Sequence, residues 1–508
     1  MPGGVPVGGM DGTSDEVFTF EAEGEEEESG PTLDDGARSW SVLAAVLLAQ
    51  FCVVAAIGTV TIAIPAIRAD LGATAGELQW ILLLFQFGFA LLLITGGRLG
   101  DLYGTRRIFL IGFGGFVLGN VIAAAAPNPE VLLAARLWQG LCGGLAAPQV
   151  LAIIQTVFPG PQRIRAIGAF AAIGGSGYML GQLITGGLLG VDLFGLGWRA
   201  AFLVYVPIGI VAFIIAAVLL PPLRVSRGEK LDIVGVGLVS VGGILILYPL
   251  IQGPEAGWPP WFLALVAVAL VVLFLFVRHQ SMLRLRDPAK PLMNLGLFQV
   301  RSFRWGLLIV GSLSMLALAQ LVYITIGLQT AFALDPITTA FATAPMPIMF
   351  MVGASLAPRA SRHLGRRVVA LAAMLLILGT LAFIGVLIMG PQPPLLIPLV
   401  LPLLVLGLAY GLAQTPMMTF ALSEVRARDA GSSSGTLQTV QQLSNAMGIA
   451  LFGTVFFALP GGGEVVRLDG PALPVTMLMV VAVAIALLIL HFWLPRWLEA
   501  PPDQDRVP

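Results

Sequence analysis

Charge is scarce in this sequence, and so are the side chains that bind metals. Aspartate, glutamate, lysine and arginine make up 11% of the 508 residues, against about 25% in a typical soluble domain. Two cysteines exclude a disulfide framework, and three scattered histidines argue against a histidine-built metal centre. The net charge of −1 excludes the basic face that nucleic-acid binding requires. We therefore expect no metal, no cofactor and no nucleic-acid partner.

Apolar residues dominate instead: the sequence is 57% hydrophobic and its mean hydropathy is +0.93. Between residues 41 and 495 it contains fourteen apolar runs, each close to the ~20 residues that cross a bilayer as a helix. Helices are predicted because an open strand would leave backbone groups unpaired in hydrocarbon. The predicted fold class is an all-α membrane protein with 14 transmembrane helices.

The order of these runs predicts five parts. They are a disordered acidic cytoplasmic tail (1–40), a six-helix bundle (41–220), two inserted helices with a cytoplasmic linker (221–302), a second six-helix bundle (303–495) and a cytoplasmic tail (496–508). Most of the 27 lysines and arginines fall in the tails and in alternate loops, which by the positive-inside rule places both termini in the cytoplasm. The expected location is the cell membrane, with several passes across it.

The two bundles resemble each other in sequence. The loop at 97–107, after the second run, has nearly the same frame of glycines and arginines as 358–367, after the tenth. Pro148 matches Pro416, and Gly181 matches Gly448. Two related helical halves are typical of transporters whose substrate site lies between the halves, near the middle of the membrane.

Five segments resemble one family: the loop 97–107, the arginine and glycines of 136–144, the glycine-rich 168–187, and the stretches 198–209 and 434–443. In these motifs the chain is similar to the major facilitator superfamily, in its branch of fourteen-helix drug:proton antiporters. The resemblance implies two six-helix bundles with two extra central helices, and proton-coupled export of drugs or antibiotics. Two positions depart from the family: Gln182 stands where a proline is usual, and Ala56 where helix 1 usually carries an acid.

The first loop motif is the candidate conformational latch. Its charges can form a cluster that also caps a neighbouring helix end, and breaking a packed cluster costs a few kcal/mol, comparable to the gap between two transporter states. The alternative is a basic loop that only fixes topology. The latch residues are Gly97, Arg98, Asp101, Gly104, Arg106 and Arg107.

Polar residues inside the spans are the candidates for a cavity and for coupling. Arg136 is the one charge deep in a predicted span, where an arginine costs about 2.5–3.5 kcal/mol unless it faces protein or water. Membrane amides also serve as interhelical contacts, so a structural role is the alternative. The predicted residues are Arg136, Gln139, Tyr178, Gln182, Gln320, Tyr323, Tyr410, Gln414, Gln438, Gln441, Gln442 and Asn445. Close helix packing is predicted at Gly177, Gly181, Gly186 and Gly187.

No aspartate or glutamate lies near the middle of a predicted span, which disfavours strongly cationic substrates. The leading interpretation is a monomeric secondary exporter, not an enzyme, of neutral or anionic hydrophobic small molecules, driven by proton antiport across the lipid bilayer. The alternative is a lipid or metabolite transporter without proton coupling. A membrane-embedded enzyme would need acids or a nucleophile gathered at one membrane face, and a transporter-derived sensor would bind its ligand without net transport.

Overall fold

The computed structural model describes residues 36–158, 160–221, 232–286, 295–365, 367–389, 396–425, 430–459 and 472–491. Within these ranges the regular structure is helical, and fourteen helical spans are long and apolar enough to cross a membrane. This confirms the predicted fold class and number of spans.

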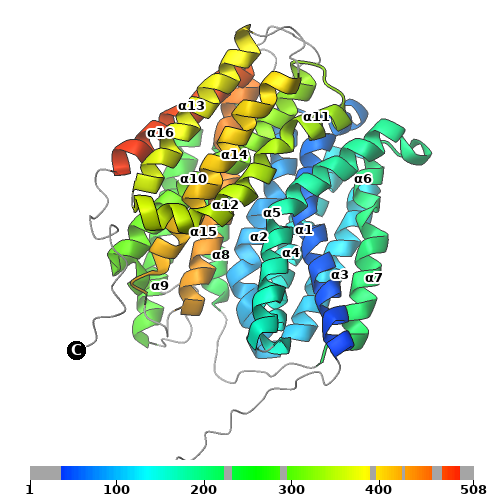
Figure 1. Ribbon diagram of the computed structural model, residues 1–508, viewed down its shortest axis with the longest axis vertical. Helices are drawn as coiled ribbons and strands as arrows, with labels where there is room; N and C mark the ends of the chain where they lie inside the picture. Colours follow the sequence, from blue (N-terminus) through cyan, green and yellow to red (C-terminus); the bar gives the residue numbers. More distant parts are fainter. Residues whose placement is uncertain are drawn as a thin grey trace, which may run out of the picture.

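The first half consists of six spans. Its elements are α1 (Gly36–Leu71), α2 (Ala75–Tyr103), α3 (Thr105–Ala124), α4 (Pro129–Val157), α5 (Gly160–Val191), the short η1 (Leu193–Gly195), and α6 (Arg199–Leu203), which continues as α7 (Tyr205–Leu219). The helices alternate in direction (Figure 1). We name the end of the bundle at which α1 begins the terminal end, and the other the opposite end.

The second half repeats this plan. Its elements are η2 (Leu295–Gln299), α10 (Arg301–Thr330), α11 (Pro336–Thr343) continuing as α12 (Pro345–Leu364), α13 (Arg367–Met389), α14 (Leu396–Leu422), α15 (Ala430–Ala458) and α16 (Ala472–His491). In the first half α2 packs on α4, α3 on α4 and α1 on α5; in the second, α12 packs on α14, α13 on α14 and α10 on α15. The sequence repeat is therefore matched in the structure, because corresponding helices of the two halves make corresponding contacts.

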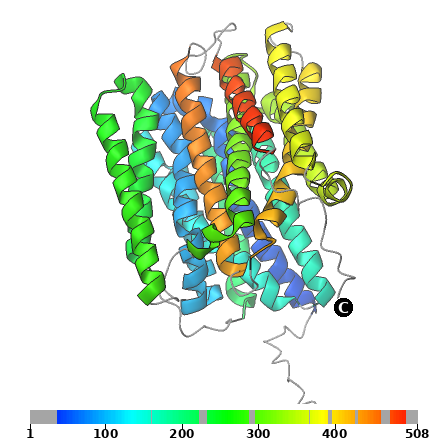
Figure 2. The ribbon, with the colours of Figure 1, turned by 90° about the vertical axis from the view of Figure 1, so that its left-hand side faces the viewer.

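Two further helices, α8 (Ile233–Ala256) and α9 (Trp261–Arg286), form a hairpin between the halves in sequence and outside them in space. Figure 2 shows this pair set against one side of the bundle. The hairpin packs on α2 and α15, and the Thr454 hydroxyl donates to the carbonyl of Leu250 at 2.6 Å. It thus covers the seam where the two halves meet along α2 and α15.

Helix caps at the opposite end explain where several spans begin. Thr74 and Glu77 form a capping box at α2: the Glu77 N–H donates to the threonine hydroxyl at 3.2 Å, and the Thr74 N–H to the glutamate at 2.7 Å. Asn128 caps α4 and Asp335 caps α11, each before a proline at the first helical position. These polar residues fix the helix ends outside the apolar spans.

Candidate functional site

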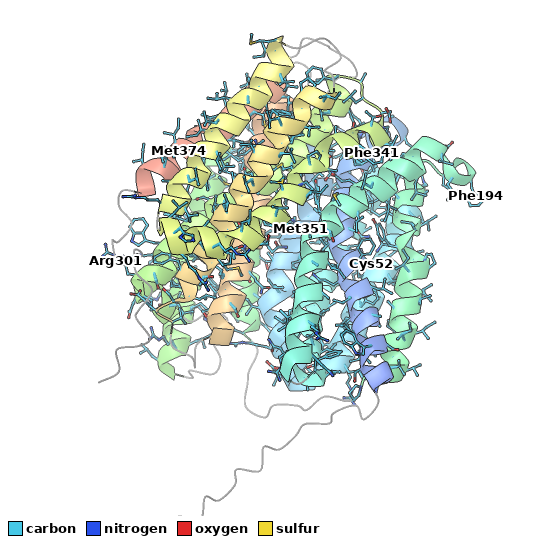
Figure 3. The ribbon with its side chains drawn as sticks, viewed as in Figure 1. Cys52, Phe194, Arg301, Phe341, Met351 and Met374 are labelled. Carbon is cyan, nitrogen blue, oxygen red and sulfur yellow. The ribbon has the colours of Figure 1, made fainter. Side chains whose placement is uncertain are left out.

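A cavity of about 300 Å³ lies between the two halves. Its walls come from α5 of the first half and from α10, α12, α14 and α15 of the second. Figure 3 labels Met351 of α12 near this boundary, where its Cγ would lie 2.9 Å from a Cβ placed on Gly175. Six of the predicted cavity residues line it: Tyr178, Tyr410, Gln414, Gln441, Gln442 and Asn445.

The remaining lining is largely apolar. Leu318 and Leu321 come from α10, and Met346 and Phe350 from α12. Apolar walls with a few polar groups are typical of small-molecule sites, in which burial supplies affinity and the polar groups fix orientation. Thioether and aromatic side chains also adapt to ligands of different shape. The wall suits a hydrophobic organic molecule.

Hydrogen bonds hold most of the polar lining in place. The Tyr410 hydroxyl donates to Gln320 Oε1 at 2.9 Å, and Asn445 donates to Gln442 Oε1 at 2.9 Å. The side-chain amide of Gln441 makes no hydrogen bond with any residue that the structure describes, so it is available to a ligand. The cavity thus combines oriented donors and acceptors with one amide that has no protein partner in the described chain.

Gln182 lies one turn beyond Tyr178 on α5 and joins the two halves on the side of the opposite end. Its Nε2 donates to the Thr325 hydroxyl at 3.1 Å, and its Oε1 accepts from the Thr343 hydroxyl at 3.2 Å. One turn further, a Cβ on Gly186 would lie 2.9 Å from the carbonyl oxygen of Pro336. In this conformation the halves touch towards the opposite end, whereas Gly174, nearer the terminal end, is exposed.

Arg136 and Gln139 are buried within the first half and are not among the residues that line the cavity. The guanidinium donates to the Ile81 carbonyl at 3.2 Å and to Gln139 Oε1 at 2.8 Å. Its Cζ lies 4.6 Å from the centre of the Phe85 ring, a cation–π distance. Among the described residues, the guanidinium therefore contacts two dipoles and a ring face, and it is not paired with a carboxylate.

Gln320, Tyr323 and Gln438 are also outside the lining set. Gln320 supports the cavity from behind through Tyr410, and it donates to the Thr380 hydroxyl at 3.2 Å. The Tyr323 hydroxyl donates to the Ile449 carbonyl at 2.5 Å and so joins α10 to α15. The polar face predicted for α15 therefore lies only partly in the cavity: Gln441, Gln442 and Asn445 line it, and Gln438 does not.

Three of the four predicted packing glycines make close approaches. A Cβ on Gly177 would lie 2.9 Å from Val54 Cγ1, and one on Gly181 would lie 2.9 Å from the Cα of Ala55 and nearer still to its carbonyl oxygen. Gly186 approaches α11, as described above. The prediction is wrong for Gly187, where a Cβ would meet no atom within 4 Å, because this residue faces away from α1 and α11.

The predicted latch residues lie at the terminal ends of α2 and α3. Gly97, Arg98 and Asp101 belong to the last turns of α2, and Gly104 joins the two helices at a φ of 94°, which favours glycine. Arg106 donates to the Ala217 carbonyl near the end of α7 at 2.5 Å. Arg107 is exposed. The bond from Arg106 satisfies a carbonyl in the last turn of α7, which lies in the same half.

Sequence reasoning missed the hydroxyls that partner the predicted polar groups. Thr61 accepts from Tyr178 at 3.3 Å, and Ser314 accepts from Gln414 at 3.1 Å. It also missed Gln86, whose Oε1 accepts from Gln442 across the halves at 3.4 Å. The position of Gln86 seven residues after Gln79, also buried, was an available signal, since this spacing places both amides on one helix face.

None of the described residues that line the cavity carries a carboxylate. Glu130 and Asp192, at the opposite-end termini of α4 and α5, are exposed. Ala56, which stands where the resembled family usually carries an acid in helix 1, is buried. Across the described residues, no group of three or more histidine, cysteine, aspartate or glutamate side chains could hold a metal ion.

Known proteins resemble this chain in sequence and in fold. Relatives include a probable actinorhodin transporter of Streptomyces coelicolor, 36% identical over 86% of this chain and 75% of the relative. The puromycin resistance protein pur8 of Streptomyces alboniger is 30% identical over 89% of this chain and 90% of its own length. The cephamycin export protein CmcT of Amycolatopsis lactamdurans is 33% identical over 80% and 83%.

Solved structures share the fold at low identity. An auto-inhibited peptide transporter of the POT family superposes with a TM-score of 0.63 at 16% identity, covering 90% of this chain and 96% of that one. The inward-open xylose transporter XylE of E. coli gives 0.59 at 13% identity, over 92% and 98%. The sequence itself matches the Major Facilitator Superfamily over residues 46–449. This match, the two repeated helical halves and the drug-exporting relatives show that the chain is a multi-pass membrane protein of the Major Facilitator Superfamily, in its drug-efflux branch.

Proposed function

We propose that this protein is a secondary active exporter of hydrophobic small molecules, such as drugs or antibiotics, that works by alternating access. The observation that carries the proposal is the apolar cavity between two repeated halves, with Tyr178 on one side and Tyr410, Gln441 and Asn445 on the other. A ligand held by both halves couples its own binding to their relative movement. The names of three relatives, which mention transport, resistance and export, also support an export function.

The terminal end faces the cytoplasm in this proposal, because the arginines of the alternate loops gather there and the positive-inside rule assigns that side. The cavity is then loaded from the cytoplasm or its leaflet while Gln182 and Gly186 keep the halves together towards the outside. Rocking breaks these contacts and closes the cytoplasmic side. Arg98, Asp101 and Arg106 take part as the latch that biases the two states. Each chain has its own cavity, so a monomer suffices.

The substrate class follows from the charges. A cation entering this cavity would lose hydration and meet no carboxylate in the described lining, which is costly in a low-dielectric site. Amides and phenols can bind neutral or anionic groups without such a penalty. Arg136, although outside the lining, adds a fixed positive charge to the first half. We therefore assign neutral and anionic amphiphiles as substrates.

Proton antiport is proposed to drive the export. Because Ala56 stands where the family usually has an acid, the exchanged proton must take a different route. With no carboxylate in the described lining, the ionisable group of an acidic substrate accounts for the exchange: it releases its proton in the cytoplasm, crosses as the anion that Arg136 favours, and takes up a proton outside. The same observation favours a second candidate function, transport of a lipid or metabolite without proton exchange.

The test uses purified protein in liposomes that contain a pH-sensitive dye. Chloramphenicol (neutral), fluorescein (anionic) and ethidium (cationic) are added in turn, and compound transport and proton movement are recorded together. Antiport predicts proton flux that depends on the compound, is largest for the anion and disappears in Arg136→Ala. Compound transport without proton movement would favour the uncoupled function.

A matched pair of variants on α15 tests the cavity. Gln441→Ala removes an amide that lines it, whereas Gln438→Ala removes one a turn earlier that does not. Loss of one hydrogen bond to a ligand weakens binding by about 0.5–1.5 kcal/mol, or roughly two- to tenfold in the half-saturating concentration. An equal effect of the two variants would contradict the assignment of this cavity as the substrate site.

A further inference from the structure

A second hollow, of about 540 Å³, lies on the other side of the α10–α15 pair. Leu308, Gly311 and Met315 of α10 and Met447 of α15 line it. The central cavity uses different residues of the same helices, among them Ser314 and Asn445. We call this second hollow the outer groove. It is distinct from the proposed substrate site, because the two helices separate them.

The outer groove is apolar along most of its length and opens to the surroundings of the bundle. Leu308 lines it and keeps 52% of its surface exposed. Trp305, half-buried, lies near its end, and tryptophan is enriched where a bilayer meets water. At this depth of a membrane-spanning bundle, an exposed apolar hollow is filled by lipid or by another apolar group.

Positive charge collects at one end of the groove. Arg304 lines it there, is exposed, and its side chain forms no hydrogen bond or ion pair with any residue that the structure describes. Arg301, one turn earlier, is also exposed and lies at the edge of the second half, towards the terminal end (Figure 3). Arg284 packs on η2, since its Nη2 would lie 2.7 Å from a Cβ on Gly296. Glu424, just after the end of α14, accepts the Ser302 N–H at 2.9 Å.

The length of the groove matches one leaflet. Arg304 and Met315, at its two ends, are eleven residues apart on one helix, which is ~16 Å at ~1.5 Å per residue. Half of the ~30 Å hydrocarbon core is ~15 Å. A chain whose headgroup lies at Arg304 therefore reaches the middle of the bilayer beside Met315 and Met447.

We propose that the outer groove binds an anionic phospholipid of the leaflet at the terminal end, with one acyl chain between α10 and α15 and its phosphate at Arg304. The groove supplies an apolar surface of the right length, and Arg304, which lines it, supplies an opposite charge worth about a fivefold preference for an anionic headgroup near the membrane surface. This lipid lies against the helix pair that also forms one wall of the transport cavity, so it is placed to influence movement of the second half.

The experiment uses the full-length protein in phosphatidylcholine nanodiscs with a small fraction of a photoreactive lipid. Phosphatidylglycerol and phosphatidylcholine, each with the same diazirine in the acyl chain, are compared. After illumination, the labelled peptides are identified and quantified by mass spectrometry. The proposal predicts labelling of α10 and α15 around Leu308 and Met447, about fivefold stronger for phosphatidylglycerol.

Two variants and a control separate headgroup from chain. Arg304→Gln brings the labelling ratio of the two lipids towards one while labelling by phosphatidylcholine persists. Ser312→Trp fills the middle of the groove and lowers labelling by both lipids. Arg278→Gln, which removes an exposed arginine of α9 outside the groove lining, leaves the ratio unchanged.

Several results would overturn the proposal. Equal labelling of the wild-type protein by the two lipids would remove the headgroup site. Labelling displaced by a transported drug would make the groove a substrate site, and cross-links between two chains at these peptides would make it a protein interface. Because labelling is measured without transport, failure here leaves the exporter function untouched.

Discussion

Replacing Gly181 by alanine tests whether α1 and α5 pack backbone against backbone. The added Cβ would lie 2.9 Å from the Cα of Ala55 and nearer still to its carbonyl oxygen. Ordinary carbon contacts are 3.5–4.0 Å, so the helices must separate by at least ~0.6 Å. The obstacle is backbone and cannot rotate away. Overpacking of this kind costs about 1–3 kcal/mol.

Gly187→Ala is the matched control, because it makes the same chemical change six residues later on the same helix, where a Cβ would meet no atom within 4 Å. Alanine favours a helix over glycine by up to ~1 kcal/mol, and this gain is common to both variants. The difference between them therefore isolates the overpacking cost. We expect Gly181→Ala to unfold at a lower temperature than the wild type, and Gly187→Ala at the same or a higher temperature.

Thermal unfolding of the purified proteins, followed in one detergent by scanning calorimetry, measures this difference. Proton flux in liposomes, measured in parallel, should fall in Gly181→Ala and persist in Gly187→Ala, since a displaced α1 disturbs the movement of the halves. Equal unfolding temperatures for the two variants would refute the close approach of α1 and α5.

Three further predictions follow from single contacts. Gln182→Leu removes two hydrogen bonds between the halves, each worth about 0.6 kcal/mol in a membrane, so maleimide labelling of a cysteine placed beside the cavity from the opposite end should rise severalfold; unchanged labelling would contradict the closure. Arg136→Met should keep yield and unfolding temperature within the equivalent of about 2 kcal/mol, because removing a buried charge offsets the lost hydrogen bonds, yet it should abolish coupled proton flux; a large loss of yield would instead support a purely structural role. Burial raises the pKa of Asp232, but hydrogen bonds from the Gly235 N–H, His279 and Gln280 outweigh it and hold the pKa below its ordinary value. Asp232→Asn should lose about 1–3 kcal/mol from pH 5 to 8. A calorimetric pH series should show this difference shrinking as the pH falls below about 4, where the unfolded chain takes up the proton first, and disappearing below the lowered pKa of the folded carboxylate.

The fold was predictable from sequence because the membrane leaves few choices. Fourteen runs of sufficient length must be helices, and the recurrence of the 97–107 frame at 358–367 indicates two related halves. The packing position of α8 and α9 was not predictable, since an apolar run does not show which other helices it packs against. Leu250 and Thr454, which join the hairpin to α15, carry no recognisable signal in sequence.

The candidate site was predictable in part, for a reason visible in α5 and α15. Polar residues within a span must face protein or water, so helical spacing identifies the polar face, but it does not say which residues of that face meet a cavity. Tyr178 lines the cavity, whereas Gln182, one turn later, bonds to the other half. The distinction depends on where α11 and α10 approach α5, which is a tertiary property.

In the proposed function, the buried Arg136 and the lack of carboxylates among the described lining residues act together. A carboxylate at the position of Ala56 would have offered a partner for a cationic drug; a buried alanine removes that option. Arg136, compensated in the described chain by the Ile81 carbonyl, the Gln139 amide and a ring face, keeps its positive charge uncancelled by any full negative one. A deprotonated substrate between the halves would then be the counter-charge that the first half otherwise lacks. On this reasoning the anion completes the site, and its protonation after transport would drive release.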